Sequence, residues 1–194
     1  MDKVTIATFD HTKDNQPKSH TVSWPKLAER LTAHTERVIK DGPLFSPVTY
    51  ENGATRGNKG VKTINLACAD FDHGEDWETI KAQLQVYAYV AYSTYSFTLD
   101  DCRFRVVIPL TKPVSNADWP DAKARIDYHV FRQGADPAAK DRARIYYLPS
   151  CPPGATRFAE HHAGKWLDVL ALPPAPGSIP KNGTEPKAEG ESRT

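Results

Sequence analysis

The spacing of strand-like runs between residues 61 and 148 limits the folds that this chain can adopt. Residues 61–71, 86–95 and 103–110 are rich in apolar, β-branched and aromatic side chains, which is typical of β-strands. A helix fits between the first and second runs, but the interval between the second and third is too short for one. A doubly wound parallel sheet needs a helix between each pair of strands, so this spacing excludes that fold.

Helical and strand patterns fill the remaining positions of this region. Apolar residues recur at helical intervals over 75–85 and 120–132, and a further strand-like run at 144–148 ends at Pro149. The order is therefore strand, helix, strand, strand, helix, strand, which predicts an α+β fold with an RRM-like or ferredoxin-like βαββαβ sheet. In such a sheet the first two strands run parallel, the third lies between them, and the fourth flanks the first.

The residues before this region predict an N-terminal α/β extension. Residues 3–9 have the composition of a strand, and residues 25–39 place apolar side chains at helical offsets behind Ser23, a possible N-cap. Residues 42–60 are rich in Gly, Pro and Asn, and we expect a long loop there. Loops of this length are uncommon unless they are functional or disordered.

The composition is that of one domain followed by a tail. The chain has 194 residues, of which 39% are hydrophobic and 25% charged, so it can bury a core. Residues 173–194 are rich in Pro, Gly, Glu, Lys and Ser, which predicts a disordered tail or linker. We expect a single domain over residues 1–172, with the RRM-like core at about 61–150.

Charge and cysteine content limit the classes of function. The formal net charge is +1, so any nucleic-acid contact must come from a local patch or be weak and transient. Cys68, Cys102 and Cys151 are widely spaced and form no CxxC pair, which argues against a disulfide framework and a Cys-rich zinc site. The N-terminus has no apolar run long enough for a signal peptide or a membrane helix. We therefore expect a soluble, cytoplasmic protein with no membrane partner.

Polar residues gather at the predicted strand ends that share one edge of the sheet. The first strand ends in Asp70 and Asp72, and the third begins with Arg103 and Arg105. Residues distant in the sequence thus converge, which predicts a functional site at this edge. The other polar residues that the topology brings there are Ser93, Thr94, Ser96, Asp136, Asp141 and Arg144.

The spacing within each pair has a chemical meaning. Asp70 and Asp72 are two residues apart in a strand, so both side chains point to one face, where they repel each other unless a cation lies between them. Paired oxygen ligands suit Mg²⁺ or Mn²⁺. Arg103 and Arg105 share a face for the same reason, and guanidinium groups bind phosphate. The alternatives are an acidic turn in which Asp72 caps the next helix, and two solvated arginines.

Three motifs in this region carry a family resemblance. They are an apolar strand ending in ACADFD, a short polar motif and a strand in STYS…RFRVVIPL, and an acidic residue before a late strand in GADPAAKDRARIYYLPS. Together, over roughly residues 61–150, they resemble the archaeo-eukaryotic primase superfamily in its phage- and plasmid-borne primase-polymerase form. Relatives with S-x-H place a histidine on the triphosphate, whereas here Arg105 occupies the equivalent place.

This resemblance implies a DNA primase or DNA-directed polymerase, which transfers nucleotides with two Mg²⁺ or Mn²⁺ ions in the replication of a phage, plasmid or mobile element. Its partners would be a single-stranded DNA template, nucleoside triphosphates and a replicative helicase. The ions would be held by Asp70, Asp72 and Asp136, with Asp141 as the rival for the third position. Phosphates or sugar would be bound by Arg103, Arg105, Arg144, Lys59, Ser93, Thr94 and Ser96, and a base by Tyr95 or Phe97.

Two other classes of function fit parts of the pattern. A non-catalytic RRM-like module would bind single-stranded nucleic acid through aromatic residues on an open sheet face, for which the candidates are Tyr87, Tyr89, Tyr92 and Tyr95. A replication-initiator endonuclease would need a histidine pair near the carboxylates. His161 and His162 are the only adjacent pair, and they follow the last predicted strand.

Overall fold

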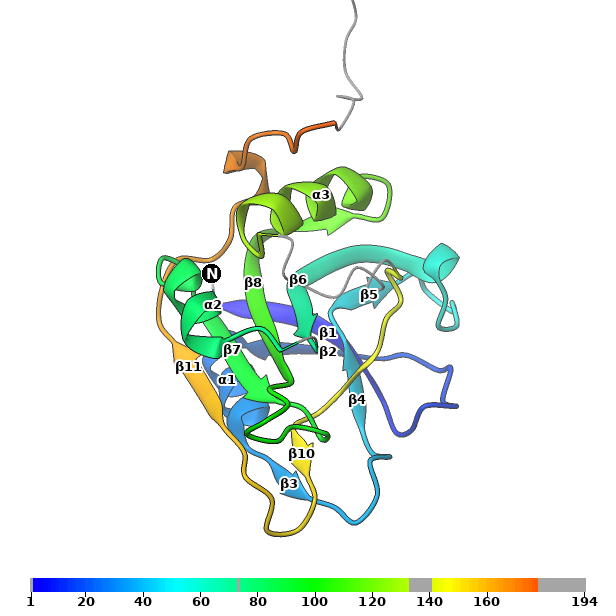
Figure 1. The fold of residues 1–194 in the computed structure, drawn as a ribbon. Helices are drawn as coiled ribbons and strands as arrows, with labels where there is room; N and C mark the ends of the chain where they lie inside the picture. Colours follow the sequence, from blue (N-terminus) through cyan, green and yellow to red (C-terminus); the bar gives the residue numbers. More distant parts are fainter. Residues whose placement is uncertain (1, 73, 133–140, 178–194) are drawn as a thin grey trace, which may run out of the picture.

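The computed structural model describes residues 2–72, 74–132 and 141–177, which form a mixed α+β fold (Figure 1). The helices are α1 (Trp24–Thr32), α2 (Trp77–Leu84) and α3 (Trp119–His129), with 3₁₀ turns η1 (Asn58–Gly60) and η2 (Val169–Ala171). The strands are β1 (Lys3–Phe9), β2 (Lys18–Ser23), β3 (Thr35–Glu36), β4 (Leu44–Ser46), β5 (Val48–Tyr50), β6 (Val61–Phe71), β7 (Tyr89–Ser93), β8 (Phe104–Ser115), β9 (Tyr146–Tyr147), β10 (Ser150–Cys151) and β11 (Ala159–His162).

A five-stranded sheet forms the centre of the molecule, with the strand order β11-β7-β8-β6-β5. Strand β8 lies between β6 and β7 and is antiparallel to both, so β6 and β7 run parallel to each other. This confirms the arrangement predicted for the first three strands of the βαββαβ pattern. Long apolar runs specify β6 and β8, and helix α2 makes the crossover between the parallel strands.

The prediction for the fourth strand was wrong. Strand β9 does not flank β6; it pairs with β4 in a separate four-stranded sheet of order β2-β1-β4-β9. The position beside β6 is taken by β5, which runs antiparallel to it. Strand β9 pairs with β4 because of a long-range contact in the core. The rings of Phe45 on β4 and Tyr146 on β9 pack there with their centroids 5.7 Å apart. The RRM-like arrangement of four strands is therefore not observed.

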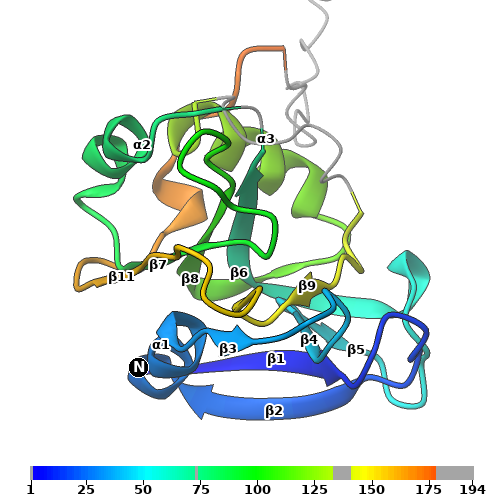
Figure 2. The ribbon, with the colours of Figure 1, turned by 60° about the horizontal axis from the view of Figure 1, so that its bottom comes forward.

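Both faces of the five-stranded sheet are covered, as Figure 2 shows from a second direction. Side chains that alternate along β6 explain this: Ala67, Ala69 and Phe71 pack in a core with α2 and α3, while Leu66 packs with α1, β1 and β4 on the other face. A sheet buried on both faces can expose a site only at its strand ends or where a polar residue interrupts a covered face.

Two expectations for the N-terminal region were wrong. Helix α1 ends at Thr32 rather than at residue 39, because its buried stripe ends at Leu31 and residues 35–36 pair with β10; Val38 is 85% exposed. The expected loop at 42–60 contains strands β4 and β5 and the turn η1. Their apolar residues are few and interrupted by Pro47, so the surrounding Gly, Pro and Asn residues hide them.

The C-terminal part adds a strand that the sequence pattern did not predict. Strand β11 pairs with β7 at the edge of the central sheet. Of the expected tail, residues 173–177 are described, and Ala175 among them is buried; residues 178–194 lie outside the described part of the chain. No helix in the described residues is long and apolar enough to cross a membrane.

Candidate functional site

A row of polar side chains crosses three strands of the central sheet on the face that packs against β1 and α1. Arg105 on β8 is the register partner of Asp70 on β6 and of Tyr92 on β7. Side chains of directly opposed residues on one face lie close together, so the three form a contiguous row. This row interrupts an otherwise apolar face, whose buried neighbours include Leu66, Val90 and Val107.

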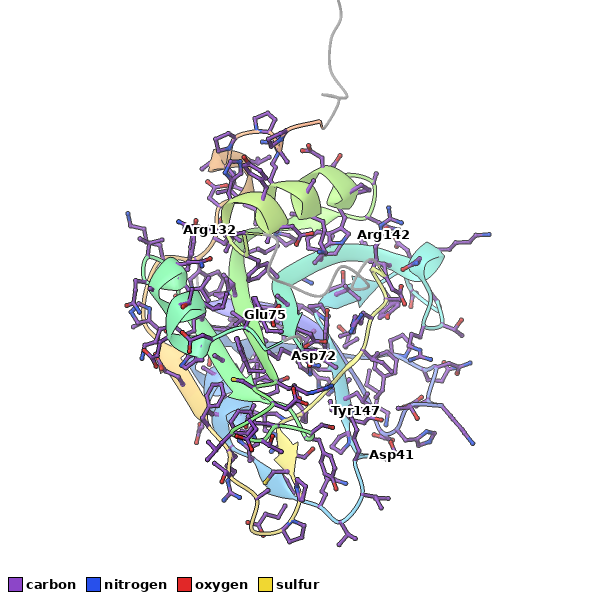
Figure 3. All side chains as sticks on the ribbon, in the orientation of Figure 1. Asp41, Asp72, Glu75, Arg132, Arg142 and Tyr147 are labelled. Carbon is purple, nitrogen blue, oxygen red and sulfur yellow. The ribbon has the colours of Figure 1, made fainter. Side chains whose placement is uncertain are left out.

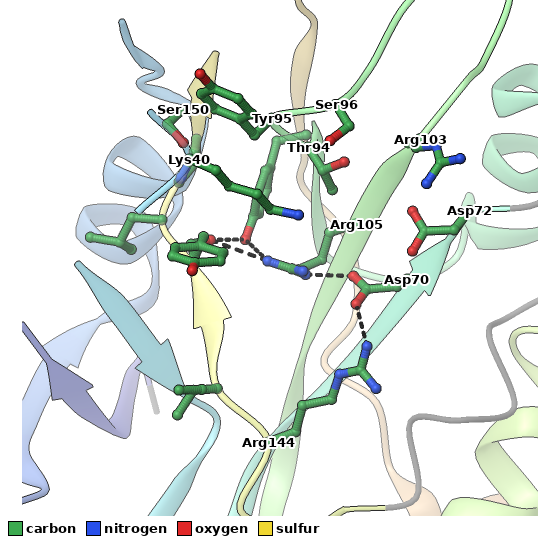
Figure 4. A pocket seen from close by; sticks show the side chains of 15 residues that line it. Lys40, Asp70, Asp72, Thr94, Tyr95, Ser96, Arg103, Arg105, Arg144 and Ser150 are labelled. Atoms are coloured by element: carbon green, nitrogen blue, oxygen red, sulfur yellow. Dashed lines mark hydrogen bonds and ion pairs between the residues drawn. The ribbon is translucent and has the colours of Figure 1, made fainter. Parts of the chain in front are cut away.

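Asp70 is bound by two arginines. Its Oδ1 accepts a hydrogen bond from Arg105 Nε at 2.6 Å, and its Oδ2 accepts one from Arg144 Nη2 at 3.1 Å (Figure 4). The Asp70 side chain is only 5% exposed. Burial alone would raise the pKa of Asp70, but the charges and hydrogen bonds of Arg105 and Arg144 outweigh it and hold that pKa below its usual value. Asp70 is therefore a buried, ionised carboxylate.

Arg105 is held in place by further contacts. Its Nη1 donates to the Tyr92 hydroxyl and to the carbonyl oxygen of Tyr147, both at 3.1 Å. The guanidinium lies 4.4 Å from the ring centroid of Tyr146, within the range of a cation–π contact. Burial raises the pKa of Tyr92 to about 12 despite the nearby charge of Arg105, so the tyrosine stays neutral. The arginine thus ties the central sheet to β9 of the other sheet.

A second polar row lies one pleat closer to the strand ends. It contains Asp72, Arg103 and Thr94, whose backbone N–H donates to the Arg103 carbonyl oxygen at 2.9 Å. Arg103 Nε donates to Asp101 at 2.7 Å; this bond, and less strongly the charge of Asp72, raises the pKa of Arg103. Unlike the inner row, this one is partly exposed. In Figure 3, Asp72 marks the position of this row on the molecule.

Both rows line one pocket of about 230 Å³. Its opposite wall comes from the residues around β9 and β10, and from Lys40 in the loop between β3 and β4. Four cationic side chains face two carboxylates, which gives the pocket an excess of positive charge. The charged residues of the lining are Lys40, Arg103, Arg105, Arg144, Asp70 and Asp72.

The far end of the pocket is aromatic and aliphatic. Tyr95 and Tyr147 line it, together with Leu148 and Pro149. The Tyr95 hydroxyl lies within hydrogen-bonding distance of the carbonyl oxygens of Arg37 (3.2 Å) and Val38 (3.0 Å), so it is tied to the loop that carries Lys40. Lys40 Nζ lies 5.9 Å from the ring centroid of Tyr147. The pocket therefore has one end suited to phosphate and another suited to a flat apolar ring.

Most residues expected at the site are brought together, although the fourth strand lies elsewhere. Asp70, Asp72, Arg103, Arg105 and Arg144 line the pocket, and so do Thr94 and Ser96. Arg144 reaches it because the segment before β9 crosses in front of the sheet, where Ser46 Oγ donates to the Arg144 carbonyl oxygen at 2.8 Å.

Four expected residues among those that the structure describes do not line the pocket. One is Phe97, whose ring packs edge-on against Phe158 with centroids 5.5 Å apart. Ser93 points to the opposite face, where it is 1% exposed and its hydroxyl bonds to the backbone of Phe158. Lys59 belongs to η1 and is not in the pocket lining, although the neighbouring Asn58 accepts a hydrogen bond from the backbone N–H of Ala143 at 3.0 Å. Asp141 also binds that N–H and closes its own turn. Asp136 lies outside the described residues.

The features expected of the other two classes of function are not met. Tyr89 and Tyr92 are 0% and 1% exposed, so they cannot form an open platform for bases. His162 stacks on Tyr89 with ring centroids 5.1 Å apart, and His161 packs edge-on against Trp24 at 6.2 Å. Both lie on β11, which β7 and β8 separate from β6. The histidine pair therefore cannot reach the carboxylates.

Lys40 and Tyr147 line the pocket but were not predicted from the sequence. Lys40 lies between the predicted helix at 25–39 and the predicted loop at 42–60, and no sequence pattern around it indicates a binding residue. Tyr147 is part of the motif RIYYLPS, and alternation along a strand would have placed it on the face opposite Tyr146. What could not be foreseen is that β9 faces the end of the central sheet.

The described residues contain no cluster of three His, Cys, Asp or Glu side chains that could hold a metal ion. Asp70 and Asp72 are thus the two carboxylates available to a cation at this pocket within the described ranges. Mg²⁺ commonly binds through one or two carboxylates together with substrate phosphates. The pair therefore suits one divalent ion that arrives with a phosphate ligand.

Fold and site together define an α+β fold with a carboxylate-bearing, arginine-rich pocket between the five-stranded sheet and the segments around β9 and β10. The chain belongs to the VapE N-terminal domain family, whose family model matches residues 37–172. No curated protein matches the chain. Among solved structures, the AEP domain of the primase-polymerase (PrimPol) of cyanophage S-2L is similar to it, with 13% identity, a TM-score of 0.47 and coverage of 89% of each chain.

Proposed function

We propose that this chain is a replication-associated nucleotidyltransferase that synthesises or extends primers on a single-stranded DNA template from nucleoside triphosphates. One observation carries the proposal: two carboxylates and three arginines from separate segments line the same pocket at the end of the central sheet. Carboxylates for a divalent cation beside guanidinium groups for phosphates are what transfer of a nucleotide requires. The replication context is supported by the family and by the primase motifs.

The pocket's own residues suggest how a nucleotide would lie. Arg103 and Arg144 would bind the triphosphate at the charged end, and the hydroxyls of Thr94 and Ser96 would donate hydrogen bonds to phosphate or sugar. The base would lie at the aromatic end against Tyr95 or Tyr147. The buried Arg105 would hold Asp70 in position rather than reach the substrate.

Asp72, and Asp70 through its remaining lone pairs, would hold a divalent cation, Mg²⁺ or Mn²⁺. When bound, that ion would neutralise charge on the triphosphate and acidify the attacking 3′-hydroxyl. A second ion needs a further ligand, for which Asp136 remains the candidate. A replicative helicase as partner and a cytoplasmic location belong to the same proposal.

A primer-synthesis assay tests the proposal. The protein is incubated with labelled nucleotides, Mg²⁺ or Mn²⁺, and primed or unprimed single-stranded DNA, and product lengths are read on a gel. We expect cation-dependent products from the unaltered protein, none from Asp72→Asn, and unchanged products from Asp10→Asn. Asp10 is the matched control because it is an exposed carboxylate that pairs with Lys18, away from the pocket lining. Polymerisation that survives in Asp72→Asn would refute the role of this pocket.

A second candidate function is binding of a nucleotide or a polynucleotide end without catalysis. The observation that favours it is the engagement of both Asp70 oxygens by arginines, which resembles a structural ion pair. In that case the unaltered protein would bind triphosphate but yield no product in the same assay with Mg²⁺ or with Mn²⁺.

A further inference from the structure

Asp70 has two positive partners in the places where a divalent cation would approach its oxygens. Arg105 Nε lies 2.6 Å from Oδ1, and Arg144 Nη2 lies 3.1 Å from Oδ2. A cation that binds to Asp70 must therefore compete with a guanidinium that already neutralises it. The contacts of each arginine indicate which of the two moves away from Asp70 when a cation binds.

The two arginines differ in burial and in what fixes them. Arg105 is 10% exposed in its side chain and bonds to Tyr92 and Tyr147 besides Asp70. The Arg144 side chain is 28% exposed and lies on the pocket wall (Figure 4). Its contact with Asp70 is longer, and its guanidinium lies 5.7 Å from the ring centroid of Tyr146, farther than the 4.4 Å of Arg105. Moving Arg105 would disrupt the link between the two sheets, whereas the head of Arg144 can reach into the pocket from its present backbone position.

Charge within the pocket favours a coupled exchange. Because cationic side chains outnumber carboxylates there, a divalent cation alone is repelled, whereas a triphosphate is attracted. Once a triphosphate binds, it offers Arg144 an anionic partner of higher charge than Asp70. The excess of positive charge falls at the same time, which lowers the repulsion of a cation.

We propose that Arg144 exchanges its partner when substrate binds: it neutralises Asp70 in the nucleotide-free protein and moves to the triphosphate in the complex, which opens Asp70 Oδ2 to the divalent cation. This inference rests on the proposed function and adds an order to it. The cation binds tightly only together with the nucleotide, and thermodynamic linkage requires each ligand to strengthen binding of the other by the same factor.

The exchange makes opposite predictions for two binding constants of one variant. In Arg144→Ala, Asp70 loses a competing positive charge, so Mn²⁺ alone binds more tightly. The same variant loses a phosphate partner, so triphosphate alone binds more weakly. An arginine that only supports the fold would weaken both or change neither. The two directions therefore separate a partner exchange from a structural role.

The test uses Mn²⁺ alone, followed by electron paramagnetic resonance of the free ion, and a non-hydrolysable α,β-imido nucleoside triphosphate in a metal chelator, followed by calorimetry. In the unaltered protein we expect saturating triphosphate to strengthen Mn²⁺ binding by about tenfold, within the usual range of coupling between two ligands. In Arg144→Ala we expect Mn²⁺ alone to bind about tenfold more tightly and triphosphate alone about tenfold more weakly, so that the coupling is lost. Arg142→Ala, two residues earlier and outside the pocket lining, is the matched control and keeps the unaltered constants.

The outcomes are distinct. If Arg144→Ala binds Mn²⁺ alone no more tightly than the unaltered protein while its triphosphate binding falls, the exchange is overturned and the nucleotide pocket stands. If the unaltered protein binds no triphosphate with or without Mn²⁺, the proposed function itself fails. Arg144→Gln, which keeps side-chain N–H donors without the charge, must shift both constants in the same directions as Arg144→Ala. If the circular dichroism spectrum of Arg144→Ala is altered, the binding constants of Arg144→Gln are used to test the exchange instead.

Discussion

Arg105 and Asp70 are direct cross-strand partners, and their ion pair of 2.6 Å lies inside the protein rather than on its surface. A buried ion pair is costly to form and more costly to break, because removal of one partner leaves a charge without compensation. This pair also links the central sheet to β9 through the hydrogen bond from Arg105 to the Tyr147 carbonyl oxygen. We therefore regard Asp70 as part of the scaffold of the pocket as well as part of its surface.

The burial of Arg105 predicts a large effect on stability. Arg105→Met should lower the free energy of unfolding by about 3 kcal/mol, at the low end for a broken buried pair because Arg144 still contacts Asp70. Arg103→Met is the matched control, since its partner Asp101 is partly exposed, and it should change stability by no more than about 1 kcal/mol. Urea unfolding with an unchanged m-value measures both. Equal effects of the two substitutions would contradict the assignment of Arg105 to the scaffold.

The two carboxylates should separate in their effects on stability and activity. Asp70→Asn leaves the buried guanidinium of Arg105 without its counter-charge and should cost about 3–5 kcal/mol. Asp72 is partly exposed, so Asp72→Asn should cost less than about 1 kcal/mol while it abolishes primer synthesis. A double substitution of both would confuse loss of activity with loss of fold. Thermal unfolding beside the gel assay distinguishes them, and a strongly destabilised Asp72→Asn would speak against this division.

The lowered pKa of Asp70 gives a specific pH dependence. A carboxyl group whose pKa is depressed on folding contributes stability above its unfolded value of 3.8, and this contribution is lost as the pH falls through the folded value. The stability difference between the unaltered protein and Asp70→Asn should therefore be constant from about pH 6 to about pH 4 and shrink below that. Urea unfolding at a series of pH values and constant ionic strength measures it. The comparison with Asp70→Asn is needed because Asp70 is not the only carboxyl group with a lowered pKa. Hydrogen bonds from Lys81 and Tyr89 outweigh the effect of burial and lower the pKa of Glu160 as well, and this contribution cancels in the difference. A difference that stays constant down to about pH 3 would show that Asp70 has no such ionised contact.

The proximity of Asp70 and Arg105, though not their ion pair, could be predicted from the sequence because both residues lie on long apolar strands whose order is set by short connections. Ser93 shows the limit of that reasoning. It is one residue from Thr94, which lines the pocket, but strand alternation turns it to the opposite face, and an error of one residue in phase reverses the orientation of a side chain.

Lys40 and Tyr147 could not be predicted, for a different reason. Their place at the pocket depends on the pairing of β4 with β9, two strands of three and two residues that are about 100 residues apart in sequence. Strands this short carry too little pattern to be recognised, and their partners are chosen by packing in the core. Local signals thus predicted the side of the pocket that the central sheet provides, together with Tyr95, whereas tertiary contacts determined the opposite wall with Lys40 and Tyr147.

Tyr95 predicts how the loop that carries Lys40 is held at the pocket. Its hydroxyl is shared between the carbonyl oxygens of Arg37 and Val38, while its ring lines the pocket. Tyr95→Phe keeps the ring but removes these bonds, so it should destabilise the protein by only about 0.5–1.5 kcal/mol. Without that anchor the loop opens more often, and hydrogen exchange of its backbone amides should rise while exchange in β6 and β8 stays the same.

Triphosphate affinity should fall in Tyr95→Phe by less than in Lys40→Ala, because the lysine charge remains present but is less often in place. Tyr87→Phe, a tyrosine on the other side of the central sheet that does not line the pocket, is the control and should leave both exchange in the loop and affinity unchanged. If Tyr95→Phe leaves loop exchange unaltered yet weakens triphosphate binding, then the hydroxyl acts on the nucleotide directly and the anchoring role is wrong.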